Sequence, residues 1–136
     1  MAKMRPEILI VDDEADIVRV ITSLLKLKGM ESFGTSDPDE AIRVAKQDDS
    51  IKLILSDVTM PKVSGPEMIR VALRQREDEV RVMFMSGAPR TLSYRRTDPL
   101  LLKPLSFETA IDEIRSVLNQ PVPSLPWAGT ERRRHH

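Results

Sequence analysis

Hydrophobic and polar positions along residues 7–118 follow two alternating patterns, and each pattern predicts a different element. Short continuous apolar runs are typical of strands covered on both faces, whereas apolar residues at helical spacing predict amphipathic helices. The predicted strands are residues 7–11, 30–33, 51–56, 80–85 and 100–102. Strand and helix alternate five times, which indicates an α/β fold with a doubly wound, five-stranded parallel sheet. Right-handed crossovers would place helices on both of its faces.

Capping residues predict where several helices begin and end. Gly29 is expected to terminate the first helix. Asp37 to Glu40 has the pattern of a capping box with proline at the first helical position, and it opens a helix through Gln47. The run Ser64-Gly65-Pro66 opens a third helix, expected to extend over residues 66–76, and Ser106 caps the last one.

The connection between the fourth and fifth strands is unusually short. Only residues 87–102 separate Ser86 from Lys103, and the fifth strand uses part of that length. A crossover between parallel strands needs about a dozen residues. Because Pro89 and Pro99 bracket this segment, the fourth helix is predicted to be short or irregular. Its basic residues are interpreted as a solvated loop rather than a partner patch; they are Arg90, Arg95 and Arg96.

Residues 119–136 differ in composition from the rest of the chain. They contain prolines without a helical period, which predicts a tail or linker after a domain formed by residues 1–118. The final two histidines resemble a purification-tag remnant. Trp127 is the one large apolar residue there that could anchor the tail to another surface.

Overall composition excludes several classes of function. The 136 residues carry a formal net charge of zero, and the domain without its tail carries −2, so direct DNA binding is not expected. There is no cysteine, and both histidines are terminal, so no thiolate or imidazole site is available in the domain. No membrane span or signal sequence is recognisable, and a cytoplasmic protein is expected.

The residues that suggest chemistry all lie at the ends of predicted strands. They are Asp12, Asp13, Asp57, Ser86 and Lys103. Taken singly, each has an ordinary structural interpretation as a helix cap, a turn residue or a solvated charge. In a parallel sheet, however, the carboxyl ends of the strands share one edge, so these groups should converge.

Convergence of three carboxylates predicts a cation among them. Crowded carboxylates repel one another unless a positive charge intervenes, and oxygen ligands suit Mg²⁺. The nearby Lys103 and Ser86 suggest room for an incoming phosphoryl group.

These motifs resemble the receiver domain of two-component response regulators, over roughly residues 5–118. The resemblance rests on VDDE after the first strand, DVTMPKVSG after the third, Ser-Gly after the fourth and Lys-Pro after the fifth. It implies a flavodoxin-like (βα)5 fold. It also implies a protein that takes a phosphoryl group from a histidine kinase or phosphotransfer protein, relays it by a conformational switch, and performs no other enzymatic reaction.

The resemblance also implies roles for individual residues. Asp57 is expected to be the phosphoacceptor, and Lys103 and Ser86 are expected to contact the phosphoryl group. The implied Mg²⁺ ligands are Asp13 and Asp57 directly, Asp12 largely through water, and the backbone carbonyl of Thr59. The bond between Lys103 and Pro104 is expected to be cis. The output partner is not identified, and homodimer formation is left open.

The crossover between Ser86 and Lys103, several residues shorter than is common in the family, is one departure from its pattern. A second departure and three alternative functions remain. Leu100 stands where the family usually has a switch aromatic, and Tyr94 is considered as a substitute reporter. A pseudo-receiver that binds partners without phosphorylation is the main alternative. A haloacid-dehalogenase phosphatase would need an acid at Thr59, and an FMN-binding loop would not place Asp12 and Asp13 beside phosphate.

Overall fold

The computed structural model describes residues 5–87, 99–103 and 106–121. Within them a five-stranded sheet has the order β2-β1-β3-β4-β5, and all neighbouring strands are parallel. The strands are β1 (Ile8–Val11), β2 (Ser32–Thr35), β3 (Leu53–Asp57), β4 (Arg81–Ser86) and β5 (Leu100–Leu102). The strand order reverses direction at β1 and β3, the position where open α/β sheets bind ligands. The expected doubly wound, flavodoxin-like fold is confirmed.

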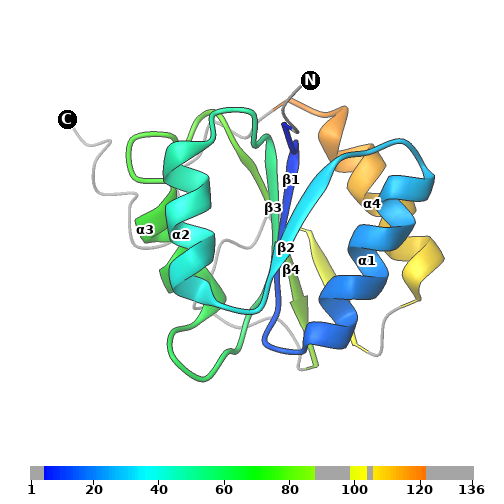
Figure 1. Ribbon diagram of the computed structural model, residues 1–136, viewed down its shortest axis with the longest axis horizontal. Helices are drawn as coiled ribbons and strands as arrows, with labels where there is room; N and C mark the ends of the chain where they lie inside the picture. The colour runs from blue at the N-terminus through cyan, green and yellow to red at the C-terminus, as the bar shows by residue number, and fades with distance from the viewer. Residues whose placement is uncertain (1–4, 88–98, 104–105, 122–136) are drawn as a thin grey trace.

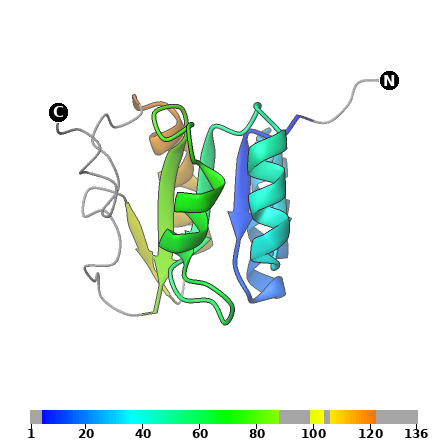
Figure 2. The same ribbon diagram turned by 90° about the vertical axis from the view of Figure 1, so that its left-hand side faces the viewer.

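Helices cover both faces of the sheet, as Figure 1 shows. They are α1 (Ala15–Leu27), α2 (Pro38–Gln47), α3 (Gly65–Ala72) and α4 (Phe107–Leu118). Helices α1 and α4 lie on one face, and α2 and α3 lie on the other, which faces the viewer in Figure 2. In the described part of the chain, no helix is both long and apolar enough to span a membrane.

Two hydrophobic clusters, one on each face, fix the central strands. In β1, Leu9 and Val11 belong to the cluster under α2 and α3, whereas Ile8 and Ile10 belong to the cluster under α1 and α4. All four side chains are fully buried. Alternate residues of a strand point to opposite faces, so a strand covered on both sides is apolar throughout. This packing holds the carboxyl ends of β1 and β3 in place.

Most helix starts agree with the capping predictions. Ser64 accepts a hydrogen bond from the Glu67 amide, and Ser106 accepts one from the Thr109 amide. At α2, Asp37 caps the Asp39 amide and proline occupies the first turn. The prediction of a full capping box is wrong, however. The Glu40 carboxylate accepts a hydrogen bond from Thr35 Oγ1 at 2.5 Å and not from the backbone amide of Asp37.

Gly29 ends α1 as predicted. It has a φ of +82°, and its amide donates to Lys26 O while the next amide, of Met30, donates to Leu25 O. This pair of bonds is the Schellman motif, in which glycine tolerates the left-handed conformation. Because the Met30 amide is used there, β2 begins only at Ser32, two residues later than predicted.

Helix α3 ends at Ala72, earlier than the predicted residue 76. Gln75 then adopts a φ of +76°, which breaks the helix without glycine or proline. The Arg76 guanidinium donates to Ala45 O at 2.6 Å and Ile51 O at 3.3 Å, which ties this turn to α2 and to the segment before β3. These long-range bonds have no local sequence signal.

Several predictions fall on residues outside the described ranges. They concern the fourth helix, the arginines and Tyr94 within residues 88–98, the Lys103–Pro104 bond, and Trp127 in the tail. Leu100 is described: it pairs with Phe84 and packs, half-buried, against the α2/α3 cluster.

Candidate functional site at the carboxyl edge of the sheet

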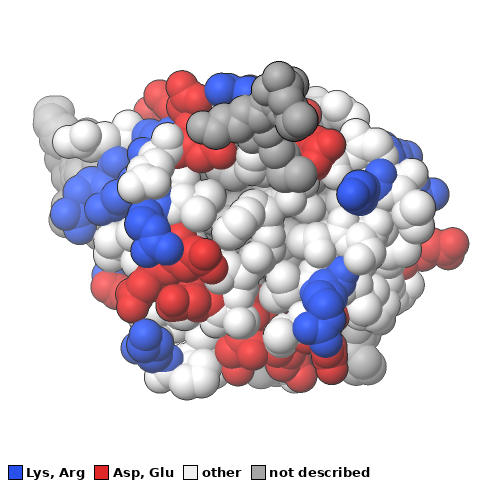
Figure 3. All heavy atoms as spheres, in the orientation of Figure 1, with Lys and Arg blue, Asp and Glu red and all other residues white. Residues whose placement is uncertain are grey.

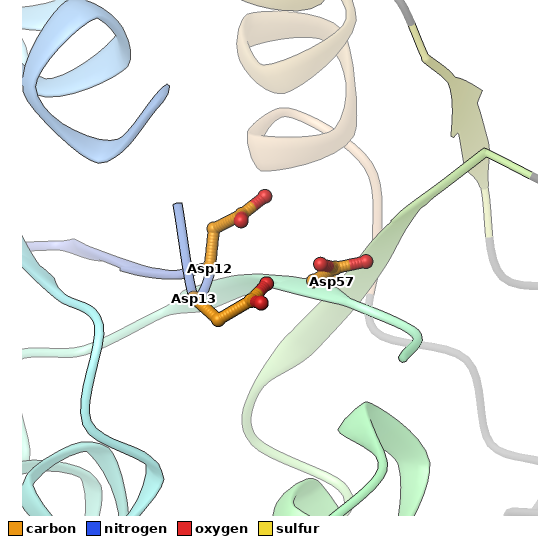
Figure 4. Close-up of side chains that lie close together, drawn as sticks. All are labelled: Asp12, Asp13 and Asp57. Carbon is orange, nitrogen blue, oxygen red and sulfur yellow. The ribbon is translucent and has the colours of Figure 1, made fainter. Parts of the chain in front are cut away.

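Three carboxylates meet where β1 and β3 end. Asp12 and Asp13 directly follow β1, and Asp57 is the last residue of β3. One oxygen from each lies within 4.8 Å of the others. The register explains this proximity, since Val11 pairs with Ser56 and the residues that follow are neighbours. Figure 4 shows the three side chains converging from the two segments.

Lys103 reaches the carboxylates from the segment after β5. Its Nζ lies 2.9 Å from Asp12 Oδ2, 3.0 Å from Glu14 Oε1 and 3.3 Å from Asp57 Oδ2. The side chain retains only 17% of its exposure, so its ammonium group is largely surrounded by these oxygens. The predicted convergence of Lys103 with Asp12 and Asp57 is therefore observed.

Ser86 and Thr59 flank this cluster in the chain. Ser86 is the last residue of β4, one position beyond Met85, the partner of Asp57. It is buried, and its carbonyl accepts the Lys103 amide at 2.8 Å. The Thr59 amide donates to Asp57 Oδ1 at 3.4 Å, a long bond. Both residues thus border the carboxylate cluster, while the roles expected of them remain predictions.

Gly65 allows the loop after β3 to return close to Asp57. A Cβ at this position would lie 2.0 Å from the Asp57 carbonyl oxygen and 2.9 Å from Ser56 Oγ. The Gly65 amide donates to Val58 O at 2.7 Å, which closes the loop. The glycine of the DVTMPKVSG motif is therefore required because there is no space for a side chain at position 65. Its absence of a Cβ lets the loop pack against the backbone of Asp57.

Burial and mutual repulsion alter the ionisation of the two buried acids. Burial and the charge of Asp12 together raise the pKa of Asp57 to about 6, although the charge of Lys103 lowers it. Burial also raises the pKa of Asp12, against a hydrogen bond from the Glu14 amide and the charge of Lys103.

Lys103 stays protonated in this setting. Burial alone would lower its pKa, but its bonds to Asp12 and Glu14 and the charges of Asp12 and Asp57 raise it above the usual value. One lysine does not balance four nearby acids. Figure 3 shows acidic side chains gathered along the lower rim, the edge toward which the strands point in Figure 1.

The arrangement fits a hard cation. Asp12 Oδ1 accepts the Glu14 amide at 2.8 Å, but Oδ2 receives no well-directed hydrogen bond despite its ion pair with Lys103. Among the described residues it is the buried side-chain oxygen left in this state. Buried acceptors without donors are costly, and an all-oxygen carboxylate set is the kind that Mg²⁺ uses.

Glu14 is the contact that the sequence interpretation missed. In the sequence, Glu14 only completes the acidic run Asp12-Asp13-Glu14 before a helix, yet its carboxylate is one of three that contact Lys103. The only available signal was its place in the run Asp-Asp-Glu. Spacing alone does not reveal which way an exposed side chain turns.

Comparisons with known proteins agree with the fold and the motifs. Residues 8–114 match the family model described as "Response regulator receiver domain". The chain is 31% identical over 118 residues to the transcriptional regulatory protein CpxR of Escherichia coli, with 84% of this chain and 50% of that protein covered. It is 27% identical over 120 residues to the transcriptional regulatory protein PrrA of Mycobacterium bovis, with 85% and 51% covered.

Solved structures give the same result. The receiver domain of the hybrid histidine kinase CckA has a TM-score of 0.68 at 30% identity, covering 82% of this chain and 98% of that one. The chemotaxis response regulator CheY4 of Vibrio cholerae, at 22% identity, shares the fold with a TM-score of 0.74 and coverages of 84% and 99%. The chain spans about half the length of the curated relatives it matches. From the family match over most of its length, the chain belongs to the receiver domains of two-component response regulators.

Proposed function

We propose that this chain accepts a phosphoryl group on Asp57 from a phosphohistidine of a histidine kinase or phosphotransfer protein. The observation that carries the proposal is the position of Asp57: a buried carboxylate at the end of the central strand, beside two further carboxylates and the Lys103 ammonium. The family match supports a signalling role rather than a separate enzymatic reaction.

In the proposed transfer, an Asp57 oxygen attacks the phosphorus atom of the donor. A P–O bond forms, the P–N bond of the phosphohistidine breaks, and its electron pair stays on the donor nitrogen. Lys103 neutralises charge on the transferring oxygens, and Ser86 donates a hydrogen bond to them. Phosphoryl transfer depends mainly on such positioning and electrostatic stabilisation. Water later hydrolyses the acyl phosphate and restores the carboxylate.

Mg²⁺ is the cofactor we infer for this reaction. Asp13 and Asp57 would hold it directly, Asp12 largely through water, and Thr59 through its backbone carbonyl. When bound, the ion would offset the negative charge of the carboxylates and of the incoming phosphoryl group. The poorly satisfied Asp12 Oδ2 supports a cation at this position.

Phosphorylation would act as a switch through the neighbouring strand ends. The acyl phosphate adds charge and acceptor oxygens, which Ser86 and Lys103 can follow. Because the Lys103 amide donates a hydrogen bond to the Ser86 carbonyl, a shift of either residue would also displace the ends of β4 and β5. Leu100 lacks both a hydroxyl and a ring, so we expect the usual aromatic reporter to be replaced by a different surface change.

The proposal extends to domain division, partners and location. Residues 1–118 would form the receiver unit, with residues 119–136 as a tail or linker, and the protein would work in the cytoplasm. The domain charge of −2 favours protein partners over direct DNA contact. Homodimer formation is one way in which the phosphorylated surface could act.

Acetyl phosphate and Mg²⁺, followed by intact-mass measurement, provide the test. The wild-type chain should gain one phosphoryl group, and Asp57→Asn should gain none while keeping its circular dichroism spectrum. Asp49→Asn, an exposed acid distant from the cluster, is the matched control and should behave as wild type. A folded wild-type chain that gains no mass with any donor would indicate a pseudo-receiver. Undiminished labelling of Asp57→Asn would place the acceptor elsewhere.

A further inference from the structure

Glu14 occupies the N-cap of α1 but does not cap the helix. Its backbone is extended, and its side chain makes no capping hydrogen bond. Instead, Oε1 accepts a hydrogen bond from Lys103 Nζ at 3.0 Å, across 89 residues of sequence. Acidic N-cap residues usually satisfy the first amides of their own helix. Here the carboxylate is directed to the lysine of the phosphorylation site.

Lys103 is already engaged by carboxylates in this arrangement. A lysine ammonium offers three N–H groups, and three carboxylates lie within 3.3 Å of Nζ: those of Asp12, Glu14 and Asp57. Glu14 and Asp57 accept hydrogen bonds from Nζ, and Asp12 is ion-paired with it, so a phosphoryl oxygen that approaches Lys103 competes with these carboxylates.

The three contacts differ in what else they serve. Asp12 and Asp57 belong to the group of carboxylates close enough to share a cation, and Glu14 does not. Asp12 is also tied to the Glu14 amide. A cation would draw Asp12 and Asp57 away from Lys103, which leaves Glu14 as the carboxylate that holds Lys103 in its resting position.

We propose that Glu14 is a positioning residue that retains Lys103 in the unphosphorylated state and competes with the phosphoryl group for it. The proposal rests on the proposed function, and it adds a resting-state restraint on that site. Release of Lys103 from Glu14 would be a step of phosphorylation, so the strength of this ion pair would set part of the basal rate.

The expected size of the effect is modest. The Glu14 side chain is 59% exposed, and ion pairs of this exposure change equilibria by factors of about two to five. Solvent ions screen such pairs, so the effect should shrink at about 0.5 M salt. Both the size and the salt dependence can be measured.

Glu14→Gln is the principal variant, because it keeps the shape and removes the charge. Asp16→Asn is the matched control: it removes the same charge from the first turn of the same helix, where Asp16 pairs only with Arg19 in the described contacts. At low salt, Glu14→Gln should raise the second-order rate constant for phosphorylation by acetyl phosphate about two- to fivefold. Asp16→Asn should match wild type, and high salt should remove the difference.

A second measurement needs neither metal nor phosphodonor. In the metal-free protein, Glu14→Gln should shift the nitrogen-15 NMR signal of Lys103 Nζ and speed its hydrogen exchange, whereas Asp16→Asn should do neither. Glu14→Ala should repeat both effects if the glutamine folds poorly. This readout reports the contact itself.

Three results would overturn the proposal. An equal rate increase in Asp16→Asn would indicate a general charge effect. A slower rate in Glu14→Gln would mean that Glu14 assists Lys103. An unchanged Nζ signal in Glu14→Gln would mean that Glu14 does not hold Lys103. Absence of phosphate uptake by wild type would instead contradict the proposed function, and the NMR comparison would still decide whether Glu14 holds Lys103.

Discussion

The surroundings of the carboxylate cluster stabilise the charged form of one residue and destabilise the charged form of another. Lys103 is stabilised as an ammonium by the acids around it, whereas Asp57 is destabilised as a carboxylate by burial and by Asp12. The pKa of Asp57 rises to about 6 even with Lys103 beside it, so for Asp57 burial and repulsion outweigh the single cation. The metal-free site is therefore under electrostatic strain near neutral pH.

This strain predicts a pH-dependent stability. The folded chain keeps a proton on Asp57 up to about pH 6, while the unfolded chain loses it near the ordinary value of 3.8. Between these values the folded state binds more protons, so the free energy of unfolding should fall as pH rises. The Asp57→Asn variant cannot ionise at this position, so it should be more stable than wild type at pH 7.5 by up to about 3 kcal/mol. The two proteins should converge near pH 4.

Urea unfolding with a chelator present, at pH 4 and pH 7.5, provides the measurement. Asp39→Asn is a suitable control, because Asp39 is exposed and pairs with Lys62 rather than with the carboxylate cluster. The same stability difference at both pH values would contradict the assignment of the effect to Asp57 ionisation.

At this scale, sequence reasoning located the cluster but not all of its contacts. Asp12, Asp57 and Lys103 could be brought together because parallel strands end at one edge. The contact of Glu14 with Lys103 could not be predicted, because the Glu14 side chain could equally have capped α1. The space around Gly65 was also beyond prediction, since it depends on where the loop after β3 returns.

Elements were predicted best where local capping decides them. The starts of α2, α3 and α4 have proline or serine signals, and Gly29 marks the end of α1. Boundaries set by distant contacts were predicted poorly. Helix α3 ends early where Gln75 turns and Arg76 bonds to Ala45 and Ile51.

The junction of β3 and α3 gives a prediction about an element boundary. Alanine at position 65 would favour the helix by up to about 1 kcal/mol, but its Cβ would meet the Asp57 carbonyl at 2.0 Å. Because backbone atoms cannot move aside as a flexible side chain can, the clash should outweigh the gain in helix propensity. Gly65→Ala is expected to lower the free energy of unfolding by about 1–3 kcal/mol, and to slow phosphate uptake by displacing Asp57.

Gly87→Ala is the control for that change. Among the described residues, a Cβ there meets nothing within 4 Å, and Gly87 directly follows β4 at the same edge. It should change neither stability nor uptake appreciably. If Gly65→Ala were as harmless as Gly87→Ala in urea unfolding, the close approach of the loop to Asp57 would be wrong.

At the scale of the whole molecule, the packing of two hydrophobic layers offsets the repulsion among the carboxylates at the edge of the sheet. Both faces of β1 and β3 are fully buried, so the strand ends are held by packing rather than by attraction among the site residues. Three carboxylates can therefore be kept together at one edge. Relief of their repulsion should then appear in the stability of the entire domain, since a ligand that binds only the folded state shifts the global equilibrium.

The last prediction is that Mg²⁺ stabilises the whole chain through this cluster. At ten times its dissociation constant, a ligand adds about 1.4 kcal/mol, which corresponds to a rise of roughly 5 °C in Tm for a domain of this size. Asp13→Asn should remove most of the rise. Asp12→Asn should remove less of it, because Asp12 is expected to hold the ion largely through water and its Oδ1 accepts the Glu14 amide.

Thermal unfolding with Mg²⁺ or with chelator, at constant ionic strength, separates specific binding from salt effects. Asp49→Asn should retain the full rise, because its exposed carboxylate pairs with Arg5 outside the cluster. Equal losses in Asp12→Asn and Asp13→Asn would contradict the division of roles between the two acids. A rise that survives in Asp13→Asn and Asp57→Asn together would place the ion elsewhere, because those two carboxylates are the direct ligands in the proposed site.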